Sequence, residues 1–368
     1  MERADAGADT EVVGAVEAEL SAYMAERRLT GSGVLPADAA LAEVLTEFVS
    51  RGGARLRARC VWWGWLAAGG PTAGDEAGVP VRLGAALELL QACALIHDDV
   101  MDRSETRRGG PAVHAHFAEA HRRAGWSGDA AAYGFAQAVL AGDLALVWAE
   151  DLLRTVPMDA AVRRRVEELW QAMRSEMVAG QHLDLRLQAE GSDDPQAALR
   201  TAELKSALYS VARPLAVGAV AAGADDRATE VLHEFGRRTG LAFQLRDDLL
   251  GVYGDPAQTG KPSGDDIRSG KLTYLTAVAV QLARRSGPPG AEARIRSTLG
   301  NPLADETELK AFRGLLRDLG AVRAVEARIA ALADEAAALL TTTACLLTPR
   351  GIGHLTALAR RIGAVAVA

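Results

Sequence analysis

The residues best suited to chemistry are aspartates that follow an apolar run. Asp98, Asp99 and Asp102 end the segment LQACALIHDDVMD, and Asp98 and Asp102 are four residues apart, so they share one face of a helix. Like charges at this spacing repel each other, and folding alone gives no reason to place them there. Carboxylates that leave room for water and phosphate oxygens are the ligands that Mg²⁺ prefers. We therefore predict a metal site with Asp98, Asp99 and Asp102 as ligands.

Two arginines, Arg107 and Arg108, follow this motif directly and could complete a pocket for a polyanion. An acidic helix end is usually a solvated surface, so the motif alone does not establish a metal site. A second acidic cluster makes a metal site the favoured interpretation. Asp247 and Asp248 end another apolar helix, 149 residues after Asp98 (247 minus 98). We expect two opposed helices whose carboxylates face each other across one cavity.

Other polar residues indicate a function only in combination with these two aspartate clusters. Gly52 and Gly53 precede Arg55 and Arg57 at a helix start, where amide donors and guanidinium groups could hold an anion. Gln91, two turns before Asp98 on nearly the same face, is a notable polar residue in an apolar helix. The second cluster also includes Gln244, Lys261, Asp266 and Lys271. Taken alone, the remaining polar residues are those of an ordinary helix face: Gln181, Asp184, Lys205 and Ser206.

The elements that must position these residues are helices. Aromatic residues make up only 5% of the chain, and alternating strand patterns are nearly absent. Residues 1–10 are small and acidic, which predicts a flexible tail, and we expect one all-helical domain over residues 11–368. A helix from Pro80 to Asp102 carries the first motif. Pro195 starts a helix that contains Lys205, and we expect a kink at Pro214.

Charge and composition exclude some classes of partner. The net charge of -7, with both signs interspersed, gives no basic stripe for nucleic acid. The longest apolar stretch, Leu215 to Ala224, is too short to span a membrane. Cys60, Cys93 and Cys345 are far apart in apolar surroundings, which indicates reduced core residues and a cytoplasmic protein.

Taken together, the motifs resemble those of the trans-isoprenyl diphosphate synthases, or polyprenyl synthetases, and most closely those of bacterial geranylgeranyl diphosphate synthases. The resemblance extends over residues of about 40 to 365. The motifs occur in the family's order: GGxRxR at Gly52 to Arg57, DDxxD at Asp98 to Asp102, RRG at Arg107 to Gly109, GQ at Gly180 and Gln181, KS at Lys205, FQxxDD at Phe243 to Asp248, and GKxxGxD at Gly260 to Asp266.

This resemblance implies an antiparallel helix bundle around a deep central cavity, the isoprenoid synthase-type fold, in a homodimer. It also implies two or three Mg²⁺ ions, held by Asp98, Asp99, Asp102, Asp247 and Asp248. In the implied reaction an allylic diphosphate ionises, and isopentenyl diphosphate attacks the cation. Asp98, Asp102, Asp247, Arg107, Lys205 and Lys261 are the implied catalytic residues. Substrate binding falls to Arg55, Gln91, Arg108, Gln181, Ser206, Gln244, Asp266 and Lys271.

The chain departs from the family pattern at two positions that matter. Ala54 stands where the family usually has a lysine, which removes a cation from the site for isopentenyl diphosphate. Gly251 replaces the third acid of the second motif. Product length depends in the family on residues before the first aspartate. Here Cys93 and Ala94 are small and Leu90 is the next large group, so we expect a product longer than C15, with C20 preferred.

Three other functions remain open. A prenyltransferase could use the same ionisation chemistry with another acceptor, such as an indole, and Ala54 motivates this alternative. A terpene cyclase would leave Arg55, Gln91 and Arg108 without a second diphosphate to bind. A non-catalytic partner subunit of a synthase would be free to lose its acidic motifs, but both are present.

Overall fold

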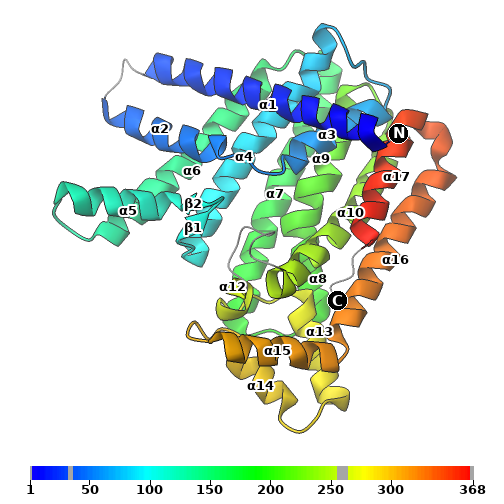
Figure 1. The fold of residues 1–368 in the computed structure, drawn as a ribbon. Helices are drawn as coiled ribbons and strands as arrows, with labels where there is room; N and C mark the ends of the chain where they lie inside the picture. The colour runs from blue at the N-terminus through cyan, green and yellow to red at the C-terminus, as the bar shows by residue number, and fades with distance from the viewer. Residues whose placement is uncertain (1, 32–35, 255–263, 365–368) are drawn as a thin grey trace. The chain divides into compact units, whose positions relative to one another are not determined.

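The computed structural model describes residues 2–31, 36–254 and 264–364 (Figure 1). In this part of the chain the secondary structure is helical apart from one hairpin, in which β1 (Thr106–Arg107) pairs antiparallel with β2 (Gly110–Pro111). The prediction of an all-α fold is therefore confirmed. Lys261, one of the predicted catalytic residues, lies outside the described residues.

The chain divides into two compact units. Unit 1 comprises Met1–Trp62 and Gly70–Ala160, and unit 2 comprises Trp63–Gly69 and Ala161–Ala368. The single domain expected over residues 11–368 stays a prediction. Helix α1 begins at Glu2. The flexible tail over residues 1–10 likewise stays a prediction.

Unit 1 is built around helix α4, which contacts α1, α2, α5 and α6. Its elements are α1 (Glu2–Gly31), α2 (Pro36–Ser50), the first part of α3 (Leu56–Ala67), η1 (Asp75–Ala77), α4 (Gly78–Asp102), β1, β2, α5 (Val113–Ala124) and α6 (Ala130–Thr155). Leu83, Leu87 and Leu90 of α4 are at most 1% exposed, so the middle of this helix is buried. It ends at Asp102 because Arg103 adopts a left-handed conformation, and the Arg103 amide donates to the Asp99 carbonyl.

Two helices are long and apolar enough to cross a membrane by length and composition. One is the segment Asp75–Asp102, whose apolar window is 78% buried, as in the core helix of a water-soluble protein. The other is α6, whose window is only 28% buried. Helix α6 thus leaves an apolar surface uncovered, including Leu140 and Val147.

Unit 2 is built around helix α10, which contacts η2, α9, α16 and α17. Its elements are the last part of α3, α7 (Ala160–Glu190), α8 (Pro195–Ala202), the π-helical segment η2 (Glu203–Ala212), α9 (Arg213–Ala221), α10 (Asp226–Tyr253), α12 (Asp265–Arg268), α13 (Tyr274–Ser286), α14 (Ala291–Thr298), α15 (Glu306–Asp318), α16 (Ala321–Thr342), η3 (Ala344–Leu346) and α17 (Pro349–Gly363).

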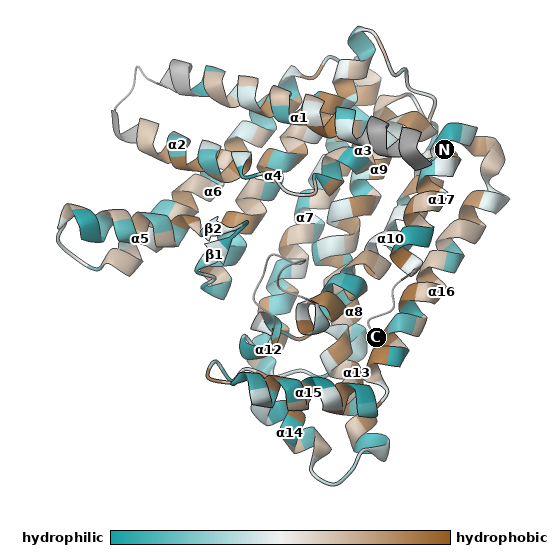
Figure 2. Cartoon of the chain, viewed as in Figure 1, coloured by the Kyte–Doolittle hydropathy of each residue, from teal (hydrophilic) through white to brown (hydrophobic). Residues whose placement is uncertain are grey.

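The helices of unit 2 are amphipathic, and this pattern determines which face of each helix is buried. Hydrophilic and hydrophobic residues alternate along α16 in Figure 2, and the buried ones include Val325, Ile329 and Leu332 at helical spacing. Helix α10 is capped by Asp225, whose carboxylate accepts from the Ala228 amide at 2.8 Å. The expected core position of Cys345 is wrong, because this cysteine is exposed in η3, whereas Cys60 and Cys93 are buried.

Candidate functional site

The first aspartate motif divides into two parts at the end of α4. The Asp98 side chain is 21% exposed and Asp102 is exposed, whereas Asp99 is 1% exposed. Asp98 and Asp102 are one turn apart and share a face, and Asp99 lies on another side of the helix. Exposed carboxylate oxygens on one face suit a hydrated Mg²⁺ ion. Asp98 and Asp102 therefore fit a hydrated Mg²⁺ ion, and the role of Asp99 as a ligand stays a prediction.

Asp99 instead holds Arg107. Its Oδ1 accepts from Arg107 Nε at 2.8 Å and also from Arg107 Nη2. Burial raises the pKa of Asp99, and this effect exceeds the opposite effects of the hydrogen bonds and charge of Arg107. Arg107 Nη2 also lies 3.9 Å from Asp98 Oδ2. The buried acid thus fixes the guanidinium of Arg107 next to the exposed acid.

The RRG motif forms the hairpin turn. Arg107 pairs with Gly110, so Arg108 and Gly109 are the two turn residues, and their φ angles are 52° and 71°. Positive φ at both positions is typical of the type I′ turn, whose twist matches that of the flanking strands. Glycine adopts this conformation readily, but Arg108 does so at a cost of about 1 kcal/mol or more. The turn holds the Arg108 side chain above the Phe48 ring, 5.6 Å from its centroid.

Arg108 also lies against the Gly52–Gly53 turn. A Cβ atom on Gly53 would lie 3.4 Å from Arg108 Nη2, an ordinary contact distance, so the guanidinium packs against this turn. The pKa of Arg108 is lowered to about 10, first of all by burial, and Glu88 opposes this shift. The charges of three neighbouring cations contribute to the lowering: Arg55, Arg57 and Arg107. This basic cluster is electrostatically suited to an anion.

The two arginines of the GGxRxR motif have different surroundings. Arg55 is 4% exposed, and its Nη1 donates to Glu88 Oε2 at 3.1 Å. Its Nη2 donates to the Val49 carbonyl at 2.9 Å. The predicted anion ligand Arg55 is thus engaged within the protein, whereas Arg57 is half-buried near Arg108. Arg57 and Glu88 were not among the predicted site residues, although the arginine spacing of the motif offered both arginines equally.

Gln91 lies one turn after Glu88 on α4 and is 9% exposed. Its Oε1 is buried and has no hydrogen-bond partner in the described part of the chain. Glu88 Oε1 is also buried without a hydrogen-bond partner among the described residues. A buried polar atom without a hydrogen bond lowers the stability of the folded protein. The side-chain amide of Gln91 is therefore suited to bind a polar ligand.

The residues predicted to set product length lie on α4 in unit 1. Leu90 is 1% exposed, Cys93 is 5% exposed and Ala94 is half-buried. Burial raises the pKa of the Cys93 thiol to about 12, so it remains a neutral, small apolar group. Cys93 Sγ lies 3.8 Å from His97 Nδ1. His97 packs against Gly142 of α6, where a side chain of any size would collide with the imidazole.

In unit 2, Lys205 lies in the π-helical segment η2. Its Nζ donates to Asp184 Oδ2 at 2.7 Å, and Asp184 Oδ1 accepts from Gln188 Nε2 at 3.1 Å. Gly180 of α7 packs directly on the Lys205 backbone amide, leaving no room for a Cβ atom. Gln181 and Ser206 are half-buried nearby in sequence. Departures from α-helical pairing often occur at functional sites, because they redirect side chains.

The second aspartate motif also divides into an exposed and a buried acid. Asp247 is exposed, and Asp248 is 6% exposed and accepts from Gln244 Nε2 at 2.8 Å. Burial raises the pKa of Asp248 to about 7, although the charge of Lys271 and the Gln244 hydrogen bond lower it. The repulsion of two neighbouring carboxylates, Asp266 and Asp247, adds to the rise.

Asp266 compensates for one departure from the family pattern. Its Oδ2 occupies the space that a Cβ atom on Gly251 would enter. A carboxylate is therefore present beside Gly251, supplied by the short helix α12 rather than by α10. The Lys271 amide donates to the Asp266 carbonyl at 3.1 Å, which ties these two predicted site residues together.

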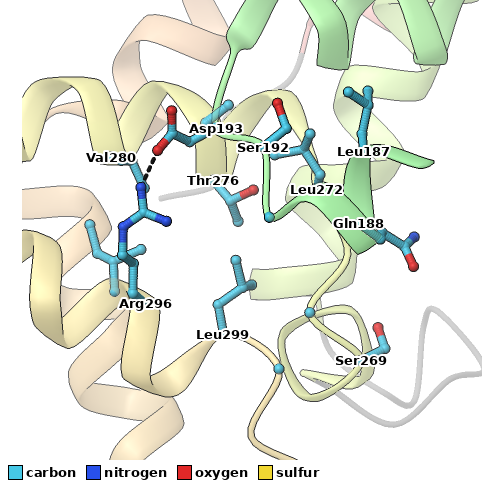
Figure 3. Close-up of a pocket in the computed structure, with 15 residues that line it drawn as sticks. Leu187, Gln188, Ser192, Asp193, Ser269, Leu272, Thr276, Val280, Arg296 and Leu299 are labelled. Carbon is cyan, nitrogen blue, oxygen red and sulfur yellow. Dashed lines mark hydrogen bonds and ion pairs between the residues drawn. The ribbon is translucent and has the colours of Figure 1, made fainter. Parts of the chain in front are cut away.

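Two other features of unit 2 contain none of the predicted site residues. Glu230, His233 and Glu234 of α10 bring potential metal-ligand atoms within 4.8 Å of one another, but Glu234 is bonded to Arg237 and Arg238. A pocket of about 350 Å³ lies between the end of α7, the loop before α13, α13 and α14 (Figure 3). The Asp193–Arg296 ion pair lies at one side of this pocket.

Comparison with known proteins bears on all these motifs. The sequence model of the family described as polyprenyl synthetase matches residues 38–315. The chain is 33% identical over 286 residues to the geranylfarnesyl diphosphate synthase of Aeropyrum pernix, which covers 77% of this chain and 81% of that protein. It is 35% identical over 232 residues to the (2E,6E)-farnesyl diphosphate synthase of Mycobacterium tuberculosis, and this alignment covers 62% of this chain and 58% of that protein.

The fold is also similar to solved structures. The crystal structure of geranylgeranyl pyrophosphate synthase from Corynebacterium glutamicum, complexed with isoprenyl diphosphate and magnesium, superposes with a TM-score of 0.91. Its sequence is 37% identical, and the match covers 96% of this chain and 98% of that chain. Motifs, family match and fold agree, and the chain belongs to the polyprenyl synthetase family of prenyltransferases.

Proposed function

We propose that the protein condenses isopentenyl diphosphate head-to-tail with an allylic diphosphate in the presence of Mg²⁺, with geranylgeranyl diphosphate (C20) as the main product. The observation that carries this proposal is the basic cluster of unit 1. Arg108 is half-buried among other cations, and Gln91, a buried amide, lies on helix α4 of the same unit. Such a cluster suits the diphosphate of a second substrate.

The aspartates supply the other part of the chemistry. When bound, Mg²⁺ neutralises the allylic diphosphate and weakens its C–O bond. Asp98 and Asp102 are the ligands that fit it in the first motif, and Asp247 is the exposed carboxylate of the second. Arg107, oriented by Asp99, lies beside the first motif and can stabilise the departing diphosphate. Asp99 thereby acts through Arg107 rather than through the metal.

Lys205, Lys271 and Gln244 are proposed to bind the allylic diphosphate in unit 2. Asp184 orients Lys205, and Gln244 bonds Asp248. Lys261, Gln181, Ser206 and Asp266 keep the roles that the resemblance implies. The proton lost after condensation passes to the released diphosphate, so no side chain is needed as a base. The small residues Cys93 and Ala94 leave room for a growing chain, which supports a product longer than C15.

A homodimer is also part of the proposal. Val139, Leu140 and Val147 of α6 are 42%, 52% and 53% exposed, an unusual density of uncovered large apolar side chains on one helix. A second copy of the chain, packing helix α6 against its counterpart, would bury this face. The reduced cysteines support an enzyme of the cytoplasm.

The test is incorporation of labelled isopentenyl diphosphate. The purified protein is incubated with farnesyl diphosphate, isopentenyl diphosphate and Mg²⁺, and with indole as a competing acceptor. We expect label in a longer prenyl diphosphate, no reaction after chelation of Mg²⁺, and loss of activity in Asp98→Asn and Asp247→Asn. Transfer of the farnesyl group to indole without incorporation of label would establish the alternative acceptor. No reaction with either acceptor would support the non-catalytic subunit.

A further inference from the structure

The turn between α2 and α3 has an unusual backbone. Gly52 and Gly53 have φ angles of 78° and 140°, and Arg55 has a φ of 47° immediately before α3 begins at Leu56. Glycine adopts positive φ without steric cost, but an arginine does not. The Arg55 carbonyl accepts from the Arg59 amide at 3.0 Å, and interactions of the Arg55 side chain can offset the remaining cost of this conformation.

These interactions link three helices of unit 1. Arg55 Nη2 donates to the carbonyl of Val49, near the end of α2, where helix carbonyls lack helical partners. Arg55 Nη1 donates to Glu88 of α4 at 3.1 Å, and Arg55 Nε lies 3.5 Å from Glu17 of α1. The Arg55 and Glu88 side chains are 2% and 3% exposed, so the pair is shielded from water.

The partner of Arg55 lies beneath the basic cluster. Glu88 is one helical turn before Gln91, so both side chains lie on the same side of α4. Glu88 is also the anion that counteracts the downward shift of the Arg108 pKa. One carboxylate thus fixes Arg55 and offsets the positive charge around Arg108.

We infer that the buried Arg55–Glu88 pair is a positioning device that holds the Gly52–Arg57 turn in the shape required to bind isopentenyl diphosphate. In this arrangement Arg57, Gln91 and Arg108 contact the diphosphate, and Arg55 acts through the backbone that it holds. The inference rests on the proposed function. It also accounts for a chain that retains Arg55 while Ala54 replaces the usual lysine next to it.

A double-mutant cycle tests this inference. The variants are Arg55→Gln, Glu88→Gln and the double variant, and the control is Arg82→Gln, which removes a partly exposed ion pair between α4 and Glu19 of α1. Steady-state kinetics give KM for isopentenyl diphosphate, KM for the allylic diphosphate and kcat. We expect each single variant to raise KM for isopentenyl diphosphate about tenfold, as for loss of one charge-assisted contact.

The double variant should have a KM for isopentenyl diphosphate no higher than that of the more impaired single variant, because both residues act as a unit. KM for the allylic substrate should stay within about twofold of the parent, as for Arg82→Gln, because the pair acts on one substrate site. If Arg55 contacts the diphosphate directly, Arg55→Gln raises KM but Glu88→Gln does not, and the inference is overturned. Equal increases of both KM values also overturn it, since they indicate a general loss of structure.

Two outcomes separate this inference from the proposed function. A parent protein whose activity has no saturable dependence on isopentenyl diphosphate overturns the proposed function. A parent with that dependence, together with additive losses in the cycle, overturns only the positioning role. If the glutamine variants fail to fold, Arg55→Lys and Glu88→Asp keep the charges but shorten or reshape the pair. They should show the same selective rise in KM, and unchanged KM values would contradict it.

Discussion

At the scale of single residues, neighbours in one motif have separate tasks. Asp98 is accessible and Asp99 is buried against Arg107, although both are adjacent aspartates at one helix end. The same division recurs at Asp247 and Asp248. In each motif a solvent-accessible carboxylate is available for a metal, and a buried carboxylate orients a basic or amide side chain.

The first residue-scale prediction concerns Ala54, which is exposed in the Gly52–Arg57 turn. Ala54→Lys adds a cation next to the proposed diphosphate site. One charge-assisted hydrogen bond contributes roughly 1.5 to 3 kcal/mol, so KM for isopentenyl diphosphate should fall by about tenfold to a hundredfold. Steady-state kinetics measure this change, with Ala54→Gln as the uncharged control. An unchanged KM would show that a neighbouring cation already replaces the lysine.

The second residue-scale prediction concerns Asp248, whose pKa burial raises to about 7. The pKa of an unfolded aspartate is about 3.9, so between these values the folded state binds more protons than the unfolded state. The free energy of unfolding of the metal-free protein should therefore decrease as pH rises from about 4 to about 7 through this group. Asp248→Asn should remove this contribution and leave the Gln244 hydrogen bond possible.

Urea unfolding in the presence of EDTA measures the difference. The variant and the parent should have similar stability near pH 4, where Asp248 is protonated in both states. Above pH 7 the variant should be more stable than the parent. The difference in free energy of unfolding should be at most a few kcal/mol, because the difference between the folded and unfolded pKa values limits it. A variant that is less stable than the parent at pH 8 would contradict the assignment of a costly buried charge.

Sequence alone identified most of these residues but not their surroundings. The motif order pointed to Asp98, Arg108 and Gln244 as site residues, because their types and spacing are unusual. It did not show that Arg55 is turned toward Glu88, since the direction of that side chain depends on a left-handed backbone angle. Partners brought together by folding, such as Asp266 beside Gly251, have no signature in local spacing.

At the scale of elements, the π-helical segment η2 is the least regular support of the site. It carries Lys205 and Ser206 and packs against α10. In this region the sequence predicted only a kink, at Pro214, because the residue pattern of the segment is that of an ordinary helix and π-helices are rare. The boundaries of regular helices were predicted better. A helix was predicted from Pro80 to Asp102, and α4 spans Gly78–Asp102.

The element-scale prediction is that Gly180→Ala separates α7 from η2. A Cβ atom at this position would collide with the backbone of Lys205, which cannot move by rotating a side chain. Overpacking of this kind costs roughly 1 to 3 kcal/mol, so Tm should fall by several degrees, and kcat should fall because Lys205 is displaced. Thermal unfolding and steady-state kinetics measure the two effects.

Gly14→Ala is the matched control, because Gly14 lies in helix α1 with nothing within 4 Å of its Cβ position. This substitution should stabilise the protein by roughly 0.5 to 1 kcal/mol through helix propensity and leave kcat unchanged. If both variants behaved alike, the close approach of α7 to η2 would not explain the glycine at position 180.

At the scale of the whole molecule, sequence correctly predicted an all-helical protein. Helical periodicity and the scarcity of strand patterns sufficed, because both are local properties. How α6 is covered could not be read from the same periodicity, which says that a face is apolar but not which surface meets it. We predict that the parent protein is a dimer and that the double substitution Leu140→Glu and Val147→Glu converts it to monomers.

Sedimentation velocity measures this conversion. Val178→Glu is the control, because Val178 is an exposed apolar residue of helix α7, at 62% exposure, that we place outside the interface. The control should remain a dimer, since a single exposed apolar residue is common on protein surfaces. A monomeric parent, or a double variant that remains dimeric, would rule out α6 as the interface.

The most direct test of the proposed reaction is the mass of the product. Farnesyl diphosphate, carbon-labelled isopentenyl diphosphate and Mg²⁺ are supplied together, and the prenyl diphosphates formed are analysed by mass spectrometry. The proposed function predicts a labelled C20 product as the main species, formed only when Mg²⁺ and both substrates are present. Consumption of farnesyl diphosphate with no labelled carbon in any prenyl product would contradict it.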